Sequence, residues 1–301
     1  MRQRFAAVRN WSSGLVALVA YACSSGGVAP PRTATPPSPR DSASTAASHE
    51  WLVRRDTGRW RYRVQTDARV TLTADTTAPT APIRSIAIYT ITVDRTPDGL
   101  RVAGTVDSTA LSAGGRVPQR TADSTNAAFG ARLDSVAGLS ALTMDSAHVP
   151  SCAGGLDPVV ANVRSLFFTI PARVHSGATW QDSTTIITCR GSVPVASTVR
   201  RTYTAGDTTS WNGRHALRVN IMSESTLEGS GVTSAAGDSI RVRGSGTSSG
   251  LLLIDPGTAM PLTTTLTGRA SVTVTSRQTS LPFDQQVTEG VTLFDGPPAR
   301  P

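Results

Sequence analysis

From about residue 51 to the end of the 301-residue chain, apolar and polar residues alternate one by one over many runs, and turn residues separate these runs. Side chains of a β-strand point to opposite faces in turn, so a period of two predicts strands with one apolar face and one polar face. Val, Thr, Ser, Ala and Gly dominate the composition, which suits half-wet antiparallel sheets better than helices. The sequence therefore predicts a mainly β protein.

Turn residues set the boundaries of the predicted strands, for example Pro-Asp-Gly at 97–99, Asn-Gly at 212–213 and Asp-Pro-Gly at 255–257. A sheet of this many strands must curl or close to bury its edges, so we expect a strongly curved antiparallel sheet or half-barrel of about 10–13 strands. The predicted strands are 60–66, 68–74, 84–94, 100–108, 129–136, 142–147, 179–189, 193–205, 214–228, 239–246, 250–254, 262–276 and 285–294.

One short helix is predicted to pack on this sheet. Asp157 can cap its N-terminus and Pro158 suits its first turn, and the helix should end near Pro171. Its apolar residues fall on one stripe, formed by Val159, Val160, Val163, Leu166 and Phe167.

The first 22 residues read as a signal peptide. Arg2, Arg4 and Arg9 precede a short apolar run at 15–20, which is far below the ~20 residues of a membrane-spanning helix. Cys23 follows a small residue, which predicts lipidation of Cys23 and a lipid anchor in the membrane. The alternative is an ordinary signal peptide cleaved near Ala22.

Residues 23–50 are rich in Pro, Ser, Thr and Ala, with too little apolar surface to offset chain entropy, so they predict a disordered linker. Residues 51–296 are then a single β-rich domain. Ser24 rather than Asp follows the cysteine, which by the usual sorting rule of envelope lipoproteins favours the outer membrane over the inner membrane.

Cys152 and Cys189 remain as a pair once Cys23 carries lipid. In an exported chain such a pair is expected to form a disulfide, which stabilises the fold by about 4 kcal/mol at most. Free or metal-bound thiols are the alternative, although no histidine lies at ligand spacing from either cysteine.

The segment from Arg59 to Val64 alternates arginine with Trp60, Tyr62 and Val64, so it predicts a strand with one basic and one apolar face. The chain has no lysine, and this segment belongs to a local arginine cluster formed by Arg54, Arg55, Arg59, Arg61, Arg63 and Arg69. The basic face is either solvated or attracted to anionic lipid head groups near the anchor. The net charge of +8 is too dispersed to indicate nucleic-acid binding.

No motif indicates an enzyme, a cofactor or a metal site. Residues 246–250 match G-x-S-x-G, but a strand rather than a helix is expected after them, so we interpret the match as chance. His49, His148, His175 and His215 are scattered without paired spacing. Trp180 follows Pro171 and Gly177 at a structural corner, where it either plugs the sheet or contributes to a ligand pocket.

The lipid-type cysteine, the Pro/Ser spacer, the successive strands and the Pro-to-Gly-x-x-Trp corner resemble uncharacterised bacterial envelope lipoproteins with the half-barrel of the lipoprotein carriers LolA and LolB. That resemblance implies a concave apolar sheet covered by helix and suited to an acyl chain. Two functions follow as expectations. The first is a non-catalytic module that binds an apolar or lipid-like ligand inside the sheet, and the second is an envelope interaction or structural protein without such a ligand.

Overall fold

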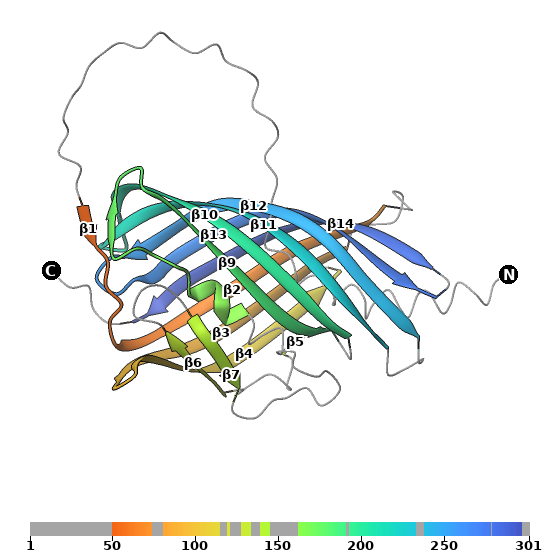
Figure 1. Ribbon diagram of the computed structural model, residues 1–301, viewed down its shortest axis with the longest axis horizontal. Helices are drawn as coiled ribbons and strands as arrows, with labels where there is room; N and C mark the ends of the chain where they lie inside the picture. Colours follow the sequence, from red (N-terminus) through yellow and green to blue (C-terminus); the bar gives the residue numbers. More distant parts are fainter. Residues whose placement is uncertain are drawn as a thin grey trace, which may run out of the picture.

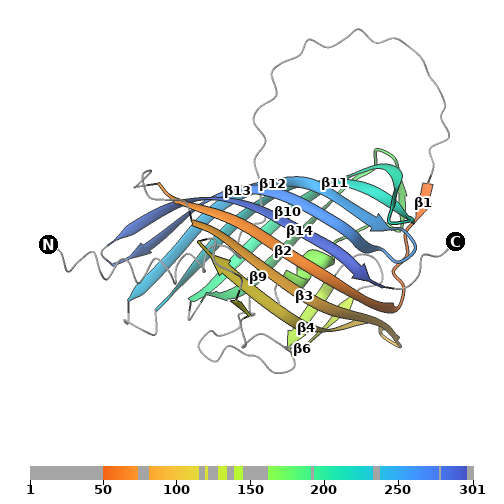
Figure 2. The ribbon, with the colours of Figure 1, turned by 180° about the vertical axis from the view of Figure 1, so that it is seen from behind.

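The computed structural model describes residues 50–73, 81–114, 119–120, 128–133, 139–144, 162–190, 193–232, 238–277 and 279–296. Their main feature is a 12-stranded antiparallel sheet with the strand order β7-β6-β4-β3-β2-β14-β13-β12-β11-β10-β9, in which β5 pairs with β4 beside this path. Figures 1 and 2 show that this sheet is strongly twisted and curls round on itself. The predicted fold class, a curved antiparallel half-barrel, is confirmed to this extent.

The sheet contains nine long strands, β2 to β4 and β9 to β14, and three short strands, β5 to β7. The sheet is formed by β2 (Gly58–Leu72), β3 (Ala81–Thr96), β4 (Gly99–Ala113), β5 (Gln119–Arg120), β6 (Ala128–Leu133), β7 (Leu139–Met144), β9 (Thr179–Arg190), β10 (Val193–Trp211), β11 (Arg214–Val232), β12 (Ser239–Asp255), β13 (Met260–Ser276) and β14 (Ser280–Asp295). A separate two-stranded pair joins β1 (Glu50–Leu52) to β8 (Arg173–His175).

One pairing, between β2 and β14, joins the N-terminal strands of the sheet to the C-terminal strands. The strands from β9 to β14 follow one another as hairpin partners along the chain. The middle of the chain therefore supplies both outer strands of the sheet, β7 and β9, while the two ends of the described chain meet at its centre.

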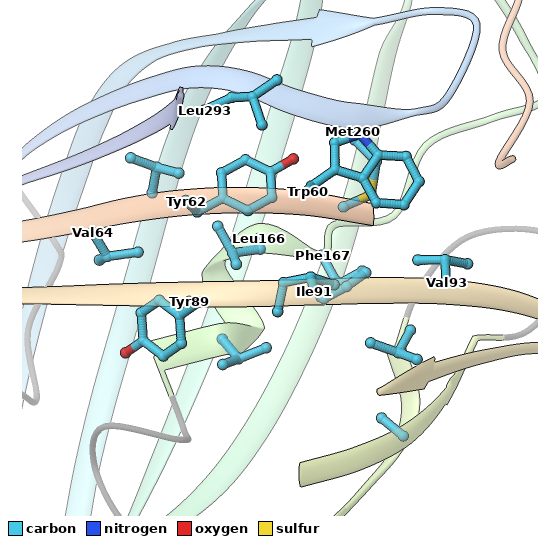
Figure 3. Close-up of a cluster of buried hydrophobic side chains, with 14 of the residues drawn as sticks. Trp60, Tyr62, Val64, Tyr89, Ile91, Val93, Leu166, Phe167, Met260 and Leu293 are labelled. Carbon is cyan, nitrogen blue, oxygen red and sulfur yellow. The ribbon is translucent and has the colours of Figure 1, made fainter. Parts of the chain in front are cut away.

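Alternation places one face of each strand inside the curl. In β2, Trp60, Tyr62 and Val64 are buried, whereas Arg61 and Arg63 between them are exposed. The predicted basic face and apolar face of this segment are confirmed. Figure 3 shows Trp60, Tyr62, Tyr89 and Ile91 of β2 and β3 lying together with residues from other parts of the chain.

Side chains from distant strands fill the inner side of the sheet. One buried cluster reaches from Ile83 of β3 to Val195 of β10, which lie at far positions in the strand order. Two further clusters occupy the part of the curl next to the segment that follows residue 162, where Leu166 and Phe167 enter one cluster and Phe168 and Ile170 enter the other. Burial of these apolar faces is the main favourable contribution to the fold.

The prediction of an α-helix is wrong for the residues that the structure describes. Residues 157–161 lie outside the described residues, and Asn162–Leu166 form a short 3-10 helix, η2, with Val163 and Leu166 buried. Phe167 and Phe168 follow in sequence but enter two different clusters. An α-helix would place such neighbours about 100° apart on one cylinder, so the chain leaves the helix here to bury both rings.

Two predicted breaks in strands are also wrong. Residues 58–72 form one strand, β2, and residues 239–255 form one strand, β12. Asp67, at the first break, pairs in register with both neighbouring strands and lies on the outer face between buried Thr66 and Ala68, where its carboxylate forms an ion pair with Arg84 of β3 at 2.5 Å. The Gly/Ser tract at the second break remains strand because its small inner residues let a neighbouring strand approach closely. A Cβ atom at Gly250 would overlap the Thr265 carbonyl oxygen.

Substitution of Gly250 by Ala should therefore destabilise the sheet. The added methyl group has no room beside β13, and overpacking of this kind costs about 1–3 kcal/mol. Gly290 of β14 is the matched control, because nothing lies within 4 Å of the position that its Cβ would occupy. Urea unfolding should show a loss for Gly250→Ala and a change below about 1 kcal/mol for Gly290→Ala. Equal effects would contradict the close approach.

Candidate functional site

Trp180 lies on the inner side of β9 and is held by protein groups on both its ring and its nitrogen. The indole stacks on the ring of Tyr203, its register partner in β10, with 5.4 Å between ring centroids and 11° between ring planes. Its Nε1 donates a hydrogen bond of 2.8 Å to the backbone carbonyl of Thr169. These contacts attach the segment after η2 to β9, which is the arrangement expected of a structural plug.

Asp182, two residues along β9, gathers the polar groups of the same corner. Its carboxylate accepts hydrogen bonds from the Tyr203 hydroxyl at 2.9 Å and from the Thr169 backbone N–H at 3.3 Å. It also forms an ion pair with Arg201 at 3.4 Å, and the two side chains are only 8% and 17% exposed. Asp182, Arg201, Tyr203 and Trp180 are hereafter the β9–β10 corner.

Electrostatics in this corner favour the charged pair and the neutral phenol. Burial raises the pKa of Tyr203, and the adjacent Asp182 carboxylate adds to the increase, while Arg201 opposes it. Burial alone would lower the pKa of Arg201, but Tyr203, Asp182 and Glu289 outweigh burial and raise it. Near neutral pH Arg201 therefore stays protonated and Tyr203 stays neutral.

Loss of the Asp182 carboxylate should cost much stability, because it leaves the Arg201 charge buried without its ion-pair partner. We expect Asp182→Ala to lower the free energy of unfolding by about 3–5 kcal/mol, measured by urea titration. Glu228 is the control, since its ion pairs with Arg241 and Arg243 involve side chains that are at least 56% exposed. Glu228→Ala should cost less than about 1 kcal/mol. A similarly small loss at Asp182 would show that the corner is not a buried anchor.

The predicted cysteine sites are only partly within the described residues. Cys189 is buried near the end of β9. Cys152 and Cys23 lie outside the described residues. The Cys152–Cys189 disulfide and the lipidation of Cys23 therefore stay predictions.

The G-x-S-x-G match lies in the middle of β12, where the strand continues on both sides of Ser248. Ser248 is buried and shares a hydrogen bond with Ser223 of the neighbouring strand. A nucleophile elbow needs a turn that exposes its serine, so the interpretation of this match as chance agrees with the geometry. Within the part of the chain that the structure describes, no group of three or more His, Cys, Asp or Glu side chains is placed to hold a metal ion. No helix in that part has the length and apolar character to cross a membrane.

The predicted arginine cluster divides into side chains with different surroundings. Arg55 is partly buried and donates a hydrogen bond of 2.5 Å to the Phe168 carbonyl oxygen. Arg61 forms an ion pair with Asp107 at 3.0 Å and lies over the ring of Phe294, 5.1 Å from its centroid. Arg69 lies further along β2, on the outer face of the sheet. The cluster is therefore not one continuous basic surface.

A hollow on the outer face of the sheet is the candidate functional site, and we name it the outer trough. It has a volume of about 900 Å³ and crosses five neighbouring strands, β11, β12, β13, β14 and β2. A twisted sheet is saddle-shaped, so its outer face is hollow along one diagonal. Most residues that line the trough come from two outward-facing rows of register partners: Glu224, Thr247, Arg269, Gln286 and Arg69 in one row, and Thr226, Ser245, Ser271, Asp284 and Thr71 in the other. The row between them adds Ser225, Gly246, Ala270 and Gln285.

Hydroxyl-bearing and charged side chains line the trough, and its two cations have no carboxylate partner among the described residues. Arg69 and Arg269 form no ion pair within 4 Å among the described residues. Asp284 accepts a hydrogen bond of 2.7 Å from Ser271. Such a surface can bind polar and anionic groups by charge-assisted hydrogen bonds. The trough could not be predicted from the sequence, because alternation identifies the outer residues of each strand but not the register that aligns them across strands.

Comparison with known proteins gives no family for this chain. No family model matches it. No curated protein matches it either. A search of solved structures finds similarity to the beta domain of the Bordetella autotransporter Brka, with 8% sequence identity and a TM-score of 0.24, covering 79% of this chain and 100% of that one. A similarity of this size carries no information about the function of this chain.

Proposed function

We propose that this chain is an exported, lipid-anchored, non-catalytic protein that binds a polar component of the cell envelope through the outer trough. The trough itself is the observation that carries the proposal. Among the described residues it is a hollow of about 900 Å³ lined by Ser, Thr, Arg, Gln and acidic side chains. The proposal corresponds to the second function expected from the sequence, an envelope interaction protein.

The filled inner side of the sheet supports this choice. An acyl chain needs an enclosed apolar space of its own, as ligand pockets usually provide. Here the apolar inner residues of the described strands pack against one another and against Leu166, Phe167 and Phe168. Binding of an apolar ligand, and the carrier function implied by the resemblance to LolA and LolB, would require these side chains to move apart. The outer trough needs no such rearrangement.

The predicted lipid anchor and linker set how far the domain lies from the membrane. The described fold begins at Glu50, which is the last residue of the predicted linker of residues 23–50. A flexible linker of that length has a root-mean-square span of roughly 30 Å. A domain held at that distance from a membrane can expose its outer face to other envelope components. We propose the outer membrane as its location, on the basis of Ser24 alone.

Filling the trough should abolish retention in the envelope when the lipid anchor is removed. In the full chain carrying Cys23→Ala, exported without lipid, we expect part of the protein to sediment with the envelope fraction through the trough. A second substitution, Thr247→Trp, places a large ring between the trough walls and should release the protein into the soluble fraction.

Thr292→Trp is the control for this test. Thr292 lies on the exposed outer face of β14, six residues and about 20 Å from Gln286, and does not line the trough. Retention should persist with Thr292→Trp. The proposal fails if Thr247→Trp leaves retention unchanged, or if both tryptophans abolish it equally while the thermal stability of both variants is intact.

A further inference from the structure

Arg269, Gln286 and Arg69 form a short row at the centre of the outer trough. Gln286 of β14 is the register partner of Arg269 on β13 and of Arg69 on β2. Neighbouring strands lie about 4.8 Å apart, so the Cα atoms of the two arginines are about 10 Å apart with the glutamine between them. All three side chains are exposed and line the trough.

The two guanidinium groups are available to an external anion. Several other arginines of this sheet face a carboxylate: for example, Arg84 pairs with Asp67 and Arg61 pairs with Asp107. Arg69 and Arg269 have no such partner among the described residues. A guanidinium matches the planar geometry of a carboxylate, and the amide of Gln286 can donate to the same group.

The rest of the trough limits which anion fits. Glu224 and Asp284 also line it, so the charges of its two arginines and two carboxylates cancel. A densely charged polyanion, such as a nucleic acid, gains little from a surface with no net charge. Thr247 and Ser271 present hydroxyl groups, and the carboxylates can accept hydrogen bonds from ligand hydroxyls. A chain rich in hydroxyls with isolated acidic groups fits this surface.

We propose that Arg69, Gln286 and Arg269 bind the carboxylate of an acidic polysaccharide whose sugar hydroxyls lie along the trough. This inference rests on the proposed function and names the ligand chemistry of the same site. The two arginines hold the acidic group from opposite sides. The flanking Ser, Thr and acidic side chains bind the neighbouring sugar units.

Binding of a hyaluronan oligosaccharide, in which glucuronate alternates with a neutral sugar, to the full exported chain carrying Cys23→Ala tests this inference, measured by isothermal titration calorimetry. We expect saturable binding that weakens as NaCl is added, because exposed charges are screened. The double variant Arg69→Gln with Arg269→Gln should weaken it at least about tenfold, through loss of two charge-assisted contacts. A neutral maltooligosaccharide of equal length should bind at least about tenfold more weakly than the hyaluronan oligosaccharide.

Arg59→Gln with Arg218→Gln is the matched control. It removes the same net charge from exposed positions of β2 and β11 that do not line the trough. It should change the affinity less than about twofold, since distant exposed charges contribute mainly through a screened field. All four sites are exposed, so thermal unfolding should confirm that both double variants fold.

Three results would overturn the inference: no binding of the hyaluronan oligosaccharide, equal losses in the two double variants, or tighter binding of double-stranded DNA than of the hyaluronan oligosaccharide. Any of these would leave the proposed function standing if Thr247→Trp still releases the protein from the envelope. Loss of that release would instead remove the proposed function itself. The two failures are therefore distinguishable.

Discussion

Burial of one face of a long twisted sheet against itself is the interaction on which the whole structure depends. Long strands keep a two-residue alternation, as in β11 from Leu217 to Ser230, where inward residues are buried and the residues between them are exposed. Among the described residues, the pair of β1 and β8, the short helix η2 and the segment after it cover only one part of this face. Over the rest the sheet curls, and a cluster that reaches from Ile83 to Val195 fills its inner side.

This arrangement assigns different tasks to the two faces. The inner face uses its apolar residues for packing, and its β9–β10 corner pairs the charges of Asp182 and Arg201 and binds the backbone of Thr169 after η2. The outward-facing residues of the trough are not part of the buried clusters, so their charge and hydrogen bonding can vary without loss of the core. A function placed on the outer face is therefore compatible with the stability of the fold, whereas an inner ligand would compete with it.

Much of the fold could be predicted from sequence because its signals are local. The alternation of Arg59 to Val64 gave the inner and outer faces of β2, and the turn at 212–213 separated β10 from β11. Signals that depend on distant contacts were misread. Asp67 was predicted to break the strand, but it lies within β2 and forms an ion pair with Arg84 of the neighbouring strand. The apolar stripe after Pro158 was predicted to be helical, but Phe167 and Phe168 enter different clusters. The trough needs five strands in register, which no single segment encodes.

Native mass spectrometry of the exported chain tests the central claim most directly, namely that the inner face is filled by the protein's own side chains and that binding occurs outside it. The account predicts the mass of the processed polypeptide with only its covalent lipid, or without lipid in the Cys23→Ala variant. A stoichiometric non-covalent lipid that persists in Cys23→Ala and survives Thr247→Trp would contradict the account, because such a ligand would have to lie inside the sheet.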